Sequence, residues 1–179
     1  YLFIKEQIMK DTNFFEGVCP FQLVEEYGSP IYVYNERVFR ARCREMANLV
    51  TYPNFKVNYS VKANSNLTLL KIAREEGLCA DAMSPGEIYV ERQAGFTPDE
   101  IFYISNNVSV EEMAYAVDQG IIVSIDSVSQ LETFGQHFPG KPVCIRVNSG
   151  VGAGHSDKVV TGGKKTKFAI YPELFAQVK

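Results

Sequence analysis

The sequence has little from which to build a metal or disulfide site: two histidines and four cysteines in 179 residues. The cysteines, Cys19, Cys43, Cys79 and Cys144, are widely spaced and form no C-x-x-C motif. Zinc sites usually need closely spaced cysteine or histidine ligands, so we expect no bound metal. Reduced thiols in a cytoplasmic protein are the simplest interpretation of this pattern.

Long hydrophobic runs and a strong charge of either sign are also missing. No segment approaches the ~18 consecutive apolar residues that a membrane span needs. The first residues carry no basic stretch before an apolar run, so we expect no secretory signal. A net charge of −3 argues against nucleic acid or an anionic membrane as the main partner. The hydrophobic content of 46% fits a globular protein of one or two domains.

The segment 55–66 contains the most informative pattern. Apolar residues at positions 55, 57, 59 and 61 alternate with polar residues at 56, 58, 60 and 62, which predicts a β-strand. Asparagine and serine then end the strand, and a helical pattern begins near Leu67. Lys62 is therefore expected at the carboxyl end of a strand, which is the edge where α/β sheets and barrels bind ligands.

Strands and helices alternate along the rest of the chain. The patterns predict helices over 19–27, 36–49, 67–76, 86–93, 110–118 and 128–134, and the beginning of another near 171–179. They predict strands over 31–34, 78–82, 101–104, 121–126 and 142–148. Glycines follow three of the helices, as left-handed helix caps require. Such alternation is typical of a parallel sheet with crossover helices.

The two faces of the later strands differ. In 121–126, Ile121, Val123 and Ile125 share one face, and Ser124 and Asp126 share the other. In 142–148 the apolar face holds positions 143, 145 and 147, and the polar face holds Cys144, Arg146 and Asn148. An open doubly wound sheet is covered on both faces, so its central strands are apolar throughout. A (β/α) barrel of the TIM type, polar inside toward its carboxyl mouth, explains the pattern better.

The length permits only part of such a barrel. A complete (β/α)8 barrel needs about 250 residues, so we expect the first five or so strand–helix units. Residues 1–50 would form a segment with a strand and a helix that leads into the barrel, and residues 51–179 its amino-terminal half. We therefore interpret the chain as an amino-terminal part of a larger enzyme.

A lysine at a barrel mouth must be hydrated, paired or used in chemistry. Partial burial would lower the pKa of Lys62 and make its amine a nucleophile for carbonyl groups. From spacing alone, an ion pair with Asp81 or Asp126 is the stronger interpretation. Arg146 has the charge and shape to bind a phosphate, carboxylate or phenolate oxygen, or to pair with one of these aspartates.

Glycines are concentrated in the segment 150–155, Gly-Val-Gly-Ala-Gly-His. No helical pattern follows, so the spacing is weak evidence for a dinucleotide site. A mobile loop that closes over the barrel mouth fits better, with an ordinary flexible insertion as the alternative. His155 is then a candidate ligand contact. Ser84 precedes a predicted helix, where capping is favoured over binding of an anion.

Several motifs occur in the order of a known family. Residues 59–64, Tyr-Ser-Val-Lys-Ala-Asn, resemble the Tyr-Ala-Val-Lys-Ala-Asn signature of the fold-type III pyridoxal-phosphate enzymes, and the chain most resembles the diaminopimelate decarboxylases. Residues 81–87 are similar to D-x-x-S-x-G-E, 126–131 to D-S-x-x-E-L, and 146–170 to R-x-N-P…T-G…S-K-F-G-I. One motif would be weak, whereas the ordered set, from about residue 23 to the end, is specific.

The resemblance implies an activity and a cofactor. The family has an alanine racemase-like barrel and forms L-lysine and CO2 from meso-2,6-diaminopimelate with pyridoxal 5'-phosphate, in lysine biosynthesis. Lys62 would hold the cofactor covalently and transfer protons after the substrate amine displaces it. Arg146 would lie near the phenolic oxygen of the cofactor, and Asp81 close to the cofactor lysine.

The resemblance also implies a lid and a dimer. Residues 155–163 would form a lid loop that meets the amino-acid substrate, with His155, Thr161 and Gly162 as its candidate residues. Lys167 would lie at the interface of a homodimer. The first strand, 31–34, would pack against a carboxyl-terminal β-domain.

The chain departs from the family at Ser149, where proline is usual, at Ala169, where glycine is usual, and at Gln130, where glutamate is usual. The later barrel strands, the Gly-rich phosphate loop and the β-domain are not among these residues. The chain alone is therefore expected to hold cofactor poorly and to turn over little substrate. Alternatives are a related ornithine, arginine or carboxynorspermidine decarboxylase, and a non-catalytic pyridoxal-phosphate carrier, although the long loop at 150–163 counts against a carrier.

Overall fold

A parallel sheet of five strands organises the protein. The computed structural model describes residues 13–152, 160–163 and 166–177. The strands are β1 (Asn58–Ser60), β2 (Cys79–Ala82), β3 (Ile101–Ile104), β4 (Ile122–Ile125) and β5 (Val143–Ile145). They lie side by side in chain order, and every neighbouring pair is parallel.

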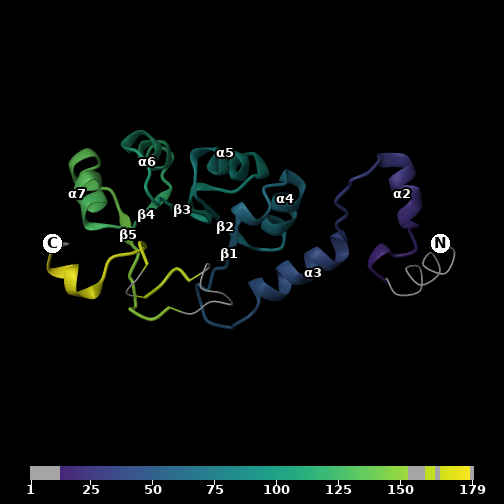
Figure 1. Cartoon of the computed structure of the whole chain (residues 1–179), viewed down its shortest axis with the longest axis horizontal. Coiled ribbons are helices and arrows are strands. Elements are labelled where there is room, and N and C mark those ends of the chain that lie inside the picture. Colours follow the sequence, from purple (N-terminus) through teal and green to yellow (C-terminus); the bar gives the residue numbers. More distant parts are fainter. Residues whose placement is uncertain (1–12, 153–159, 164–165, 178–179) are drawn as a thin grey trace.

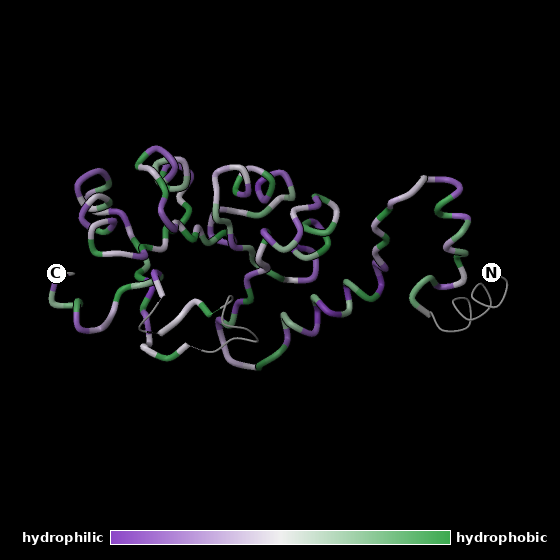
Figure 2. Tube along the Cα trace, viewed as in Figure 1, coloured by the Kyte–Doolittle hydropathy of each residue, from purple (hydrophilic) through white to green (hydrophobic). Residues whose placement is uncertain are grey.

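The crossover helices all cover one side of this sheet. They are α4 (Leu67–Glu75), α5 (Pro85–Ala94), α6 (Val110–Val117) and α7 (Val128–His137), and Figure 1 shows them in a row along the strands. Hydrophilic and hydrophobic stretches alternate along each helix, as amphipathic helices require (Figure 2). A doubly wound sheet would have helices on both faces and a reversal of strand order. The predicted barrel class is therefore confirmed.

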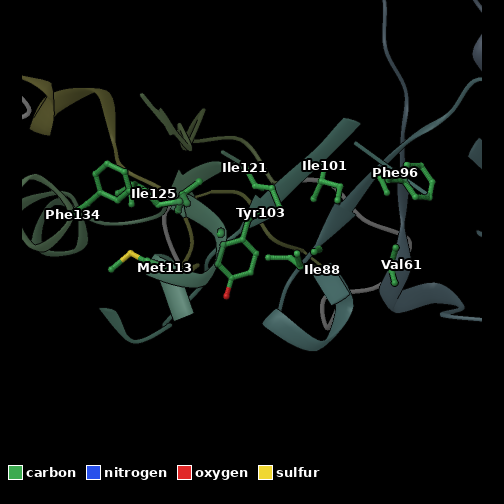
Figure 3. Packing of buried hydrophobic residues seen from close by; sticks show 14 of the residues in the cluster. Val61, Ile88, Phe96, Ile101, Tyr103, Met113, Ile121, Ile125 and Phe134 are labelled. Atoms are coloured by element: carbon green, nitrogen blue, oxygen red, sulfur yellow. The ribbon is translucent and has the colours of Figure 1, made fainter. Parts of the chain in front are cut away.

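The core lies between the helices and the outer face of the sheet. Figure 3 shows side chains from strands and helices in one continuous layer. Tyr103 of β3, Met113 of α6 and Ile125 of β4 are at most 1% exposed there. The apolar parity of the strands thus marks the helix-covered face, and the opposite face remains available for a cavity.

The amino-terminal part extends away from the sheet (Figure 1). It contains η1 (Asn13–Phe15), α2 (Pro20–Tyr27) and α3 (Glu36–Ala47), and α2 has no buried residue. Ion pairs join α3 to the end of α4: Arg40 Nη1 lies 2.8 Å from Glu75 Oε2, and Arg44 Nη2 lies 2.7 Å from Glu76 Oε2. No helix in the described residues could cross a bilayer.

Four predicted elements are wrong in type or extent. The strand predicted over 142–148 is only β5, because its ladder with β4 ends at the pair Ile125–Ile145. Residues 31–34 form no strand, because no described strand lies beside them to complete the ladder, and Tyr32 is 90% exposed. The strand predicted over 55–62 is only β1, because its ladder with β2 ends at the pair Ser60–Asp81. The chain then turns through a short 3-10 helix, η2 (Val61–Ala63). Near the end of the chain, Pro172–Gln177 is a 3-10 helix rather than an α-helix.

Buried on the core-facing side of α5 is one carboxyl group, that of Glu91. Its residue is 0% exposed, and among the described residues neither carboxyl oxygen has a hydrogen-bond partner. Burial raises the pKa of Glu91 to about 8, with smaller contributions from the negative charges of Glu87 and Asp81. The folded protein therefore holds Glu91 as the neutral acid near neutral pH.

This group makes stability depend on pH. Below its ordinary value of 4.5, Glu91 is protonated in both states and costs nothing. Between 4.5 and about 8 only the unfolded chain releases the proton, so the free energy of unfolding falls by up to about 1.4 kcal/mol per pH unit. We expect Glu91→Gln to remove this slope between pH 5 and 8 in urea unfolding.

Glu132→Gln, which changes an exposed glutamate of α7, is the matched control and should leave the slope as in the wild type. Equal slopes for Glu91→Gln and the wild type would contradict the assignment of the buried acid.

Candidate active site

A cavity of about 470 Å³ opens at the carboxyl end of the strands, on the face away from the helices. Its wall includes four residues that the sequence singles out, Lys62, Asp81, Arg146 and Thr161. The other lining residues are Ser60, Met83, Phe102, Ile104, Asn106, Ser124, Cys144, Ile145 and Phe168. Residues far apart in the sequence thus meet because every parallel strand ends at the same edge.

Lys62 reaches this cavity from the turn after β1. Its side chain is exposed, rather than partly buried as the longer predicted strand would have made it. Among the described residues it forms no ion pair with Asp81 or Asp126, so the structural pairing favoured by spacing alone is not found. The amine is therefore accessible to a ligand in the cavity.

Asp81 presents a half-buried carboxylate to the same cavity. Burial raises the pKa of Asp81, whereas the hydrogen bond from the Ser60 hydroxyl and the positive charge of Lys62 oppose that rise. Ser60 Oγ lies 3.0 and 2.9 Å from the two carboxylate oxygens. Lys62 and Asp81 thus place an amine and a carboxylate in the wall of the same cavity, and the two groups form no ion pair with each other.

Arg146 follows β5 and is held by three groups. Its Cζ lies 4.9 Å from the ring centroid of Phe168, and its Nη1 lies 3.5 Å from Asn106 Oδ1. Nη1 is also 3.9 Å from Asp126 Oδ1, a long ion pair. Because this contact involves only one nitrogen, the guanidinium keeps donors for an anionic group of a ligand.

The sequence reasoning did not single out Asn148 as a site residue, although this residue organises the loop beside the cavity. Its side chain is 2% exposed. Asn148 Oδ1 accepts hydrogen bonds from the amides of Gly150 (2.9 Å) and Gly163 (3.0 Å). Its Nδ2 donates to Thr166 Oγ1 (3.2 Å) and to the carbonyl of Phe168 (3.0 Å). One side chain thus joins the two ends of the loop at 150–163, which contains the predicted lid.

The glycines of this loop allow its two arms to touch. A Cβ on Gly152 would lie 2.3 Å from the carbonyl oxygen of Gly162, and one on Gly162 would lie 2.8 Å from the carbonyl oxygen of Val151. Glycine is therefore needed at these two positions because a side chain at either one would clash with the backbone of the other arm. Thr161 lines the cavity directly before this contact, whereas His155 lies outside the described residues.

The loop returns to β5 through Ala169 and Ile170. The Ile170 amide donates to the carbonyl of Arg146 (2.8 Å), and the Ala169 amide donates to Asp126 Oδ1 (2.6 Å). Ala169 has a φ of +72°, in the left-handed region. This conformation explains why glycine is usual at the corresponding position of the resembled motif.

Lys167 lies in a second, larger cavity of about 850 Å³, near the amino ends of α6 and α7. It does not line the cavity of Lys62. Gln130 lines the second cavity too; its Nε2 donates to the carbonyl of Ser105 (2.6 Å) and its Oε1 accepts from the Asp126 amide (2.9 Å). The glutamate usual at this position could not make the first contact, because a carboxylate has no donor.

Strand parity could have identified some of the overlooked lining residues, since Ser60 and Ser124 alternate with core positions. Phe168 and Asn106 follow no such rule. They come from loops whose path depends on contacts far away in the sequence.

Comparison with known proteins agrees with this geometry. Residues 36–179 match the family model described as pyridoxal-dependent decarboxylase, pyridoxal binding domain. This chain belongs to that family. The described residues of the match carry the sheet, Lys62, Asp81 and Arg146.

Curated relatives of this decarboxylase family share its sequence. The chain is 42% identical over 166 residues to the diaminopimelate decarboxylase of Methanothermobacter thermautotrophicus, covering 89% of this chain and 39% of the relative. It is 34% identical over 154 residues to that of Escherichia coli K12, covering 84% and 36%. The chain thus spans about two fifths of the length of these relatives.

Solved structures of the family share the fold. Diaminopimelate decarboxylase from Helicobacter pylori, complexed with L-lysine, has a TM-score of 0.75 at 25% identity, over 87% of this chain and 41% of that chain. The enzyme from M. jannaschii, also with L-lysine, has a TM-score of 0.73 at 28% identity, over 88% and 39%. A viral arginine decarboxylase with a TM-score of 0.64 at 20% identity shows the fold alone.

The hydrogen bonds of Asn148 lead to a prediction about the loop. Asn148→Ala removes the Oδ1 atom that accepts from both the Gly150 and the Gly163 amides and leaves these amides unpaired, at a cost of about 2–4 kcal/mol. We expect a lower free energy of unfolding and faster hydrogen exchange at these two amides.

Ser149→Ala at the adjacent exposed position is the control, with an expected change within about 0.5 kcal/mol. Equal stability and equal exchange rates for the two variants would show that Asn148 does not hold the loop.

Proposed function

We propose that this chain is the cofactor-binding part of a pyridoxal-phosphate-dependent decarboxylase that converts meso-2,6-diaminopimelate to L-lysine and CO2. The supporting observation is that Lys62, Asp81 and Arg146 meet at one cavity in a chain 42% identical to a diaminopimelate decarboxylase. The neighbours solved with L-lysine, the product of this reaction, support the same substrate.

The lining residues fit pyridoxal phosphate. The cavity volume of about 470 Å³ lies within the range of roughly 300–1,000 Å³ typical of small-ligand sites. An accessible amine on Lys62 suits the aldehyde, and the guanidinium of Arg146 suits the phenolic oxygen. Apolar side chains of Phe102, Ile104 and Phe168 provide walls for an aromatic ring.

Bound pyridoxal phosphate would supply the electron sink for the charge left when CO2 departs. The residues of this chain have complementary tasks. Lys62 would be the covalent anchor and, once released by the substrate amine, a base and acid for proton transfer at its Nζ. Arg146, fixed by Phe168 and Asn106, would orient the ring, and Asp81 would supply a negative charge beside the amine.

Other substrates within the family are less well supported. Ornithine, arginine and carboxynorspermidine decarboxylases remain the same-class alternative, but the arginine decarboxylase neighbour shares only the fold. A non-catalytic carrier is the different-class alternative. The loop from Gly150 to Gly163, joined by Asn148, argues against it because a carrier has no substrate to enclose.

The proposed enzyme would act on a small amino acid as a homodimer in the cytoplasm. The dimer rests on the resemblance at Lys167, which is exposed and does not line the cavity of Lys62, as an interface position requires. The widely spaced cysteines support a reducing compartment.

Trapping of the cofactor tests the anchor. Incubation with pyridoxal phosphate and reduction with borohydride should label the peptide that contains Lys62, because reduction makes even a weak, reversible imine permanent. Lys62→Ala should abolish this label, whereas Lys71→Ala, at an exposed lysine of α4, should not reduce it. Peptide mass mapping reads the result, and an undiminished label in Lys62→Ala would exclude the assignment.

Substrate choice is tested on the complete gene product. We expect CO2 release from meso-2,6-diaminopimelate to exceed release from ornithine by about 100-fold or more in kcat/KM, because a site with polar contacts rejects substrates that leave those contacts unpaired. A preference for ornithine or arginine would replace the proposed substrate while leaving the cofactor assignment intact.

A further inference from the structure

Ser60 is the last residue of β1 and lies directly opposite Asp81 in the parallel register of β1 and β2. Both side chains are half-buried and line the cavity that Lys62 reaches two residues later. Nothing in the sequence pattern distinguishes this serine from any other polar strand residue. Its contact with the acid is a consequence of the register.

The contact between these two residues is specific. Ser60 Oγ lies 3.0 Å from Asp81 Oδ1 and 2.9 Å from Oδ2, so the hydroxyl faces both carboxylate oxygens. In the described part of the chain, no other group donates a hydrogen bond to this carboxylate. A hydrogen bond to an ionised acceptor is stronger than one between neutral groups. The orientation of Asp81 therefore depends on Ser60.

The surroundings of Asp81 disfavour its ionised form, so the hydrogen bond from Ser60 is needed to stabilise the carboxylate. Burial raises the pKa of Asp81, and the negative charge of Glu87 raises it further; the negative charge of Asp81 in turn raises the pKa of the buried Glu91. Only Lys62 and the Ser60 hydroxyl act in the opposite direction. Of these two groups, the Ser60 hydroxyl would remain a hydrogen-bond donor to the carboxylate whether or not Lys62 is bonded to the cofactor.

We propose that Ser60 is a positioning residue of the cofactor site, whose hydroxyl holds the Asp81 carboxylate in the orientation that faces the cavity beside Lys62. The role of Ser60 in the reaction rests on the proposed function, because Asp81 and Lys62 act together only when the cavity holds pyridoxal phosphate. The signature that this segment resembles has alanine at this position, so a chain with alanine here can fold.

The test compares Ser60→Ala with Ser60→Thr in the chain without cofactor. Carbon-13 NMR of labelled aspartate follows the titration of Asp81. Loss of the hydroxyl should raise the pKa of Asp81 by about half to one unit, the equivalent of a hydrogen bond of about 1 kcal/mol. Threonine keeps the hydroxyl and suits a strand, so its Asp81 pKa should stay close to that of the wild type.

Ser65→Ala is the matched control, since it removes an exposed hydroxyl five residues further along. It should not change the titration. Circular dichroism shows whether each variant is folded. An unchanged Asp81 pKa in folded Ser60→Ala would overturn the proposal, as would a shift that Ser60→Thr reproduces.

A double-mutant cycle adds a readout with cofactor. Ser60→Ala should weaken the binding of pyridoxal phosphate, followed by absorbance, whereas in an Asp81→Asn background the same change should have an effect below about twofold. Equal effects in both backgrounds would mean that Ser60 acts independently of Asp81. Failure of wild-type Lys62 to be labelled would instead reject the proposed function and leave the NMR result unaffected.

Discussion

The parallel ladder from β1 to β5 is the constraint on which the site depends. Because all five strands run in the same direction, the residues that follow them arrive at one edge, and Lys62, Asp81 and Arg146 meet there from positions up to 84 apart (146 − 62). The helices cover only the outer face, so the apolar layer is completed without the inner side chains. Charged side chains on the inner face therefore do not disrupt the apolar packing of the core.

A second set of contacts, around Asp126 and Asn148, holds the chain after β5. Asp126 accepts the Ala169 amide, and the Asn148 side chain connects Gly150 with Gly163, so the loop leaves and returns at nearly the same place. The return brings Phe168 against the Arg146 guanidinium. The left-handed backbone of Ala169 is the conformational cost of this path. The segment after β5 thereby contributes two cavity residues, Thr161 and Phe168, to a wall otherwise made by the strands and the residues that follow them.

Three carboxyl groups on β2 and α5 have different environments. Glu91 is buried with no hydrogen-bond partner among the described residues and is neutral near neutral pH. Asp81 is half-buried and accepts a hydrogen bond from Ser60, and Glu87 accepts the amide of Met83 at 2.6 Å at the start of its helix. Burial raises the pKa of Glu91 and of Asp81, and the Ser60 hydroxyl opposes the rise for Asp81. The acid that faces the cavity is the one that receives a hydroxyl donor.

The sequence by itself determined the element types and the edge of the site. Period-two alternation distinguished the strands from the amphipathic helices, glycines marked helix ends, and ordered motifs indicated the family and the cofactor lysine. These signals are local, so they can be read without the fold. Local signals failed for residues 31–34, which have strand character but no described neighbouring strand, and for Lys62, whose strand ends where its ladder partner ends.

Only the tertiary structure decided which polar groups meet. The pairing of Ser60 with Asp81, the connection of Gly150 and Gly163 through Asn148 and the stacking of Phe168 on Arg146 join residues between 15 and 22 positions apart (81 − 60, 163 − 148, 168 − 146). Such contacts depend on strand register and on the path of a loop, which are set by packing over the whole sheet. The sequence predicted Lys62 as the cofactor anchor, and the fold showed that its side chain is exposed, unpaired within the described residues and in the same cavity wall as Asp81, which accepts a hydrogen bond from Ser60.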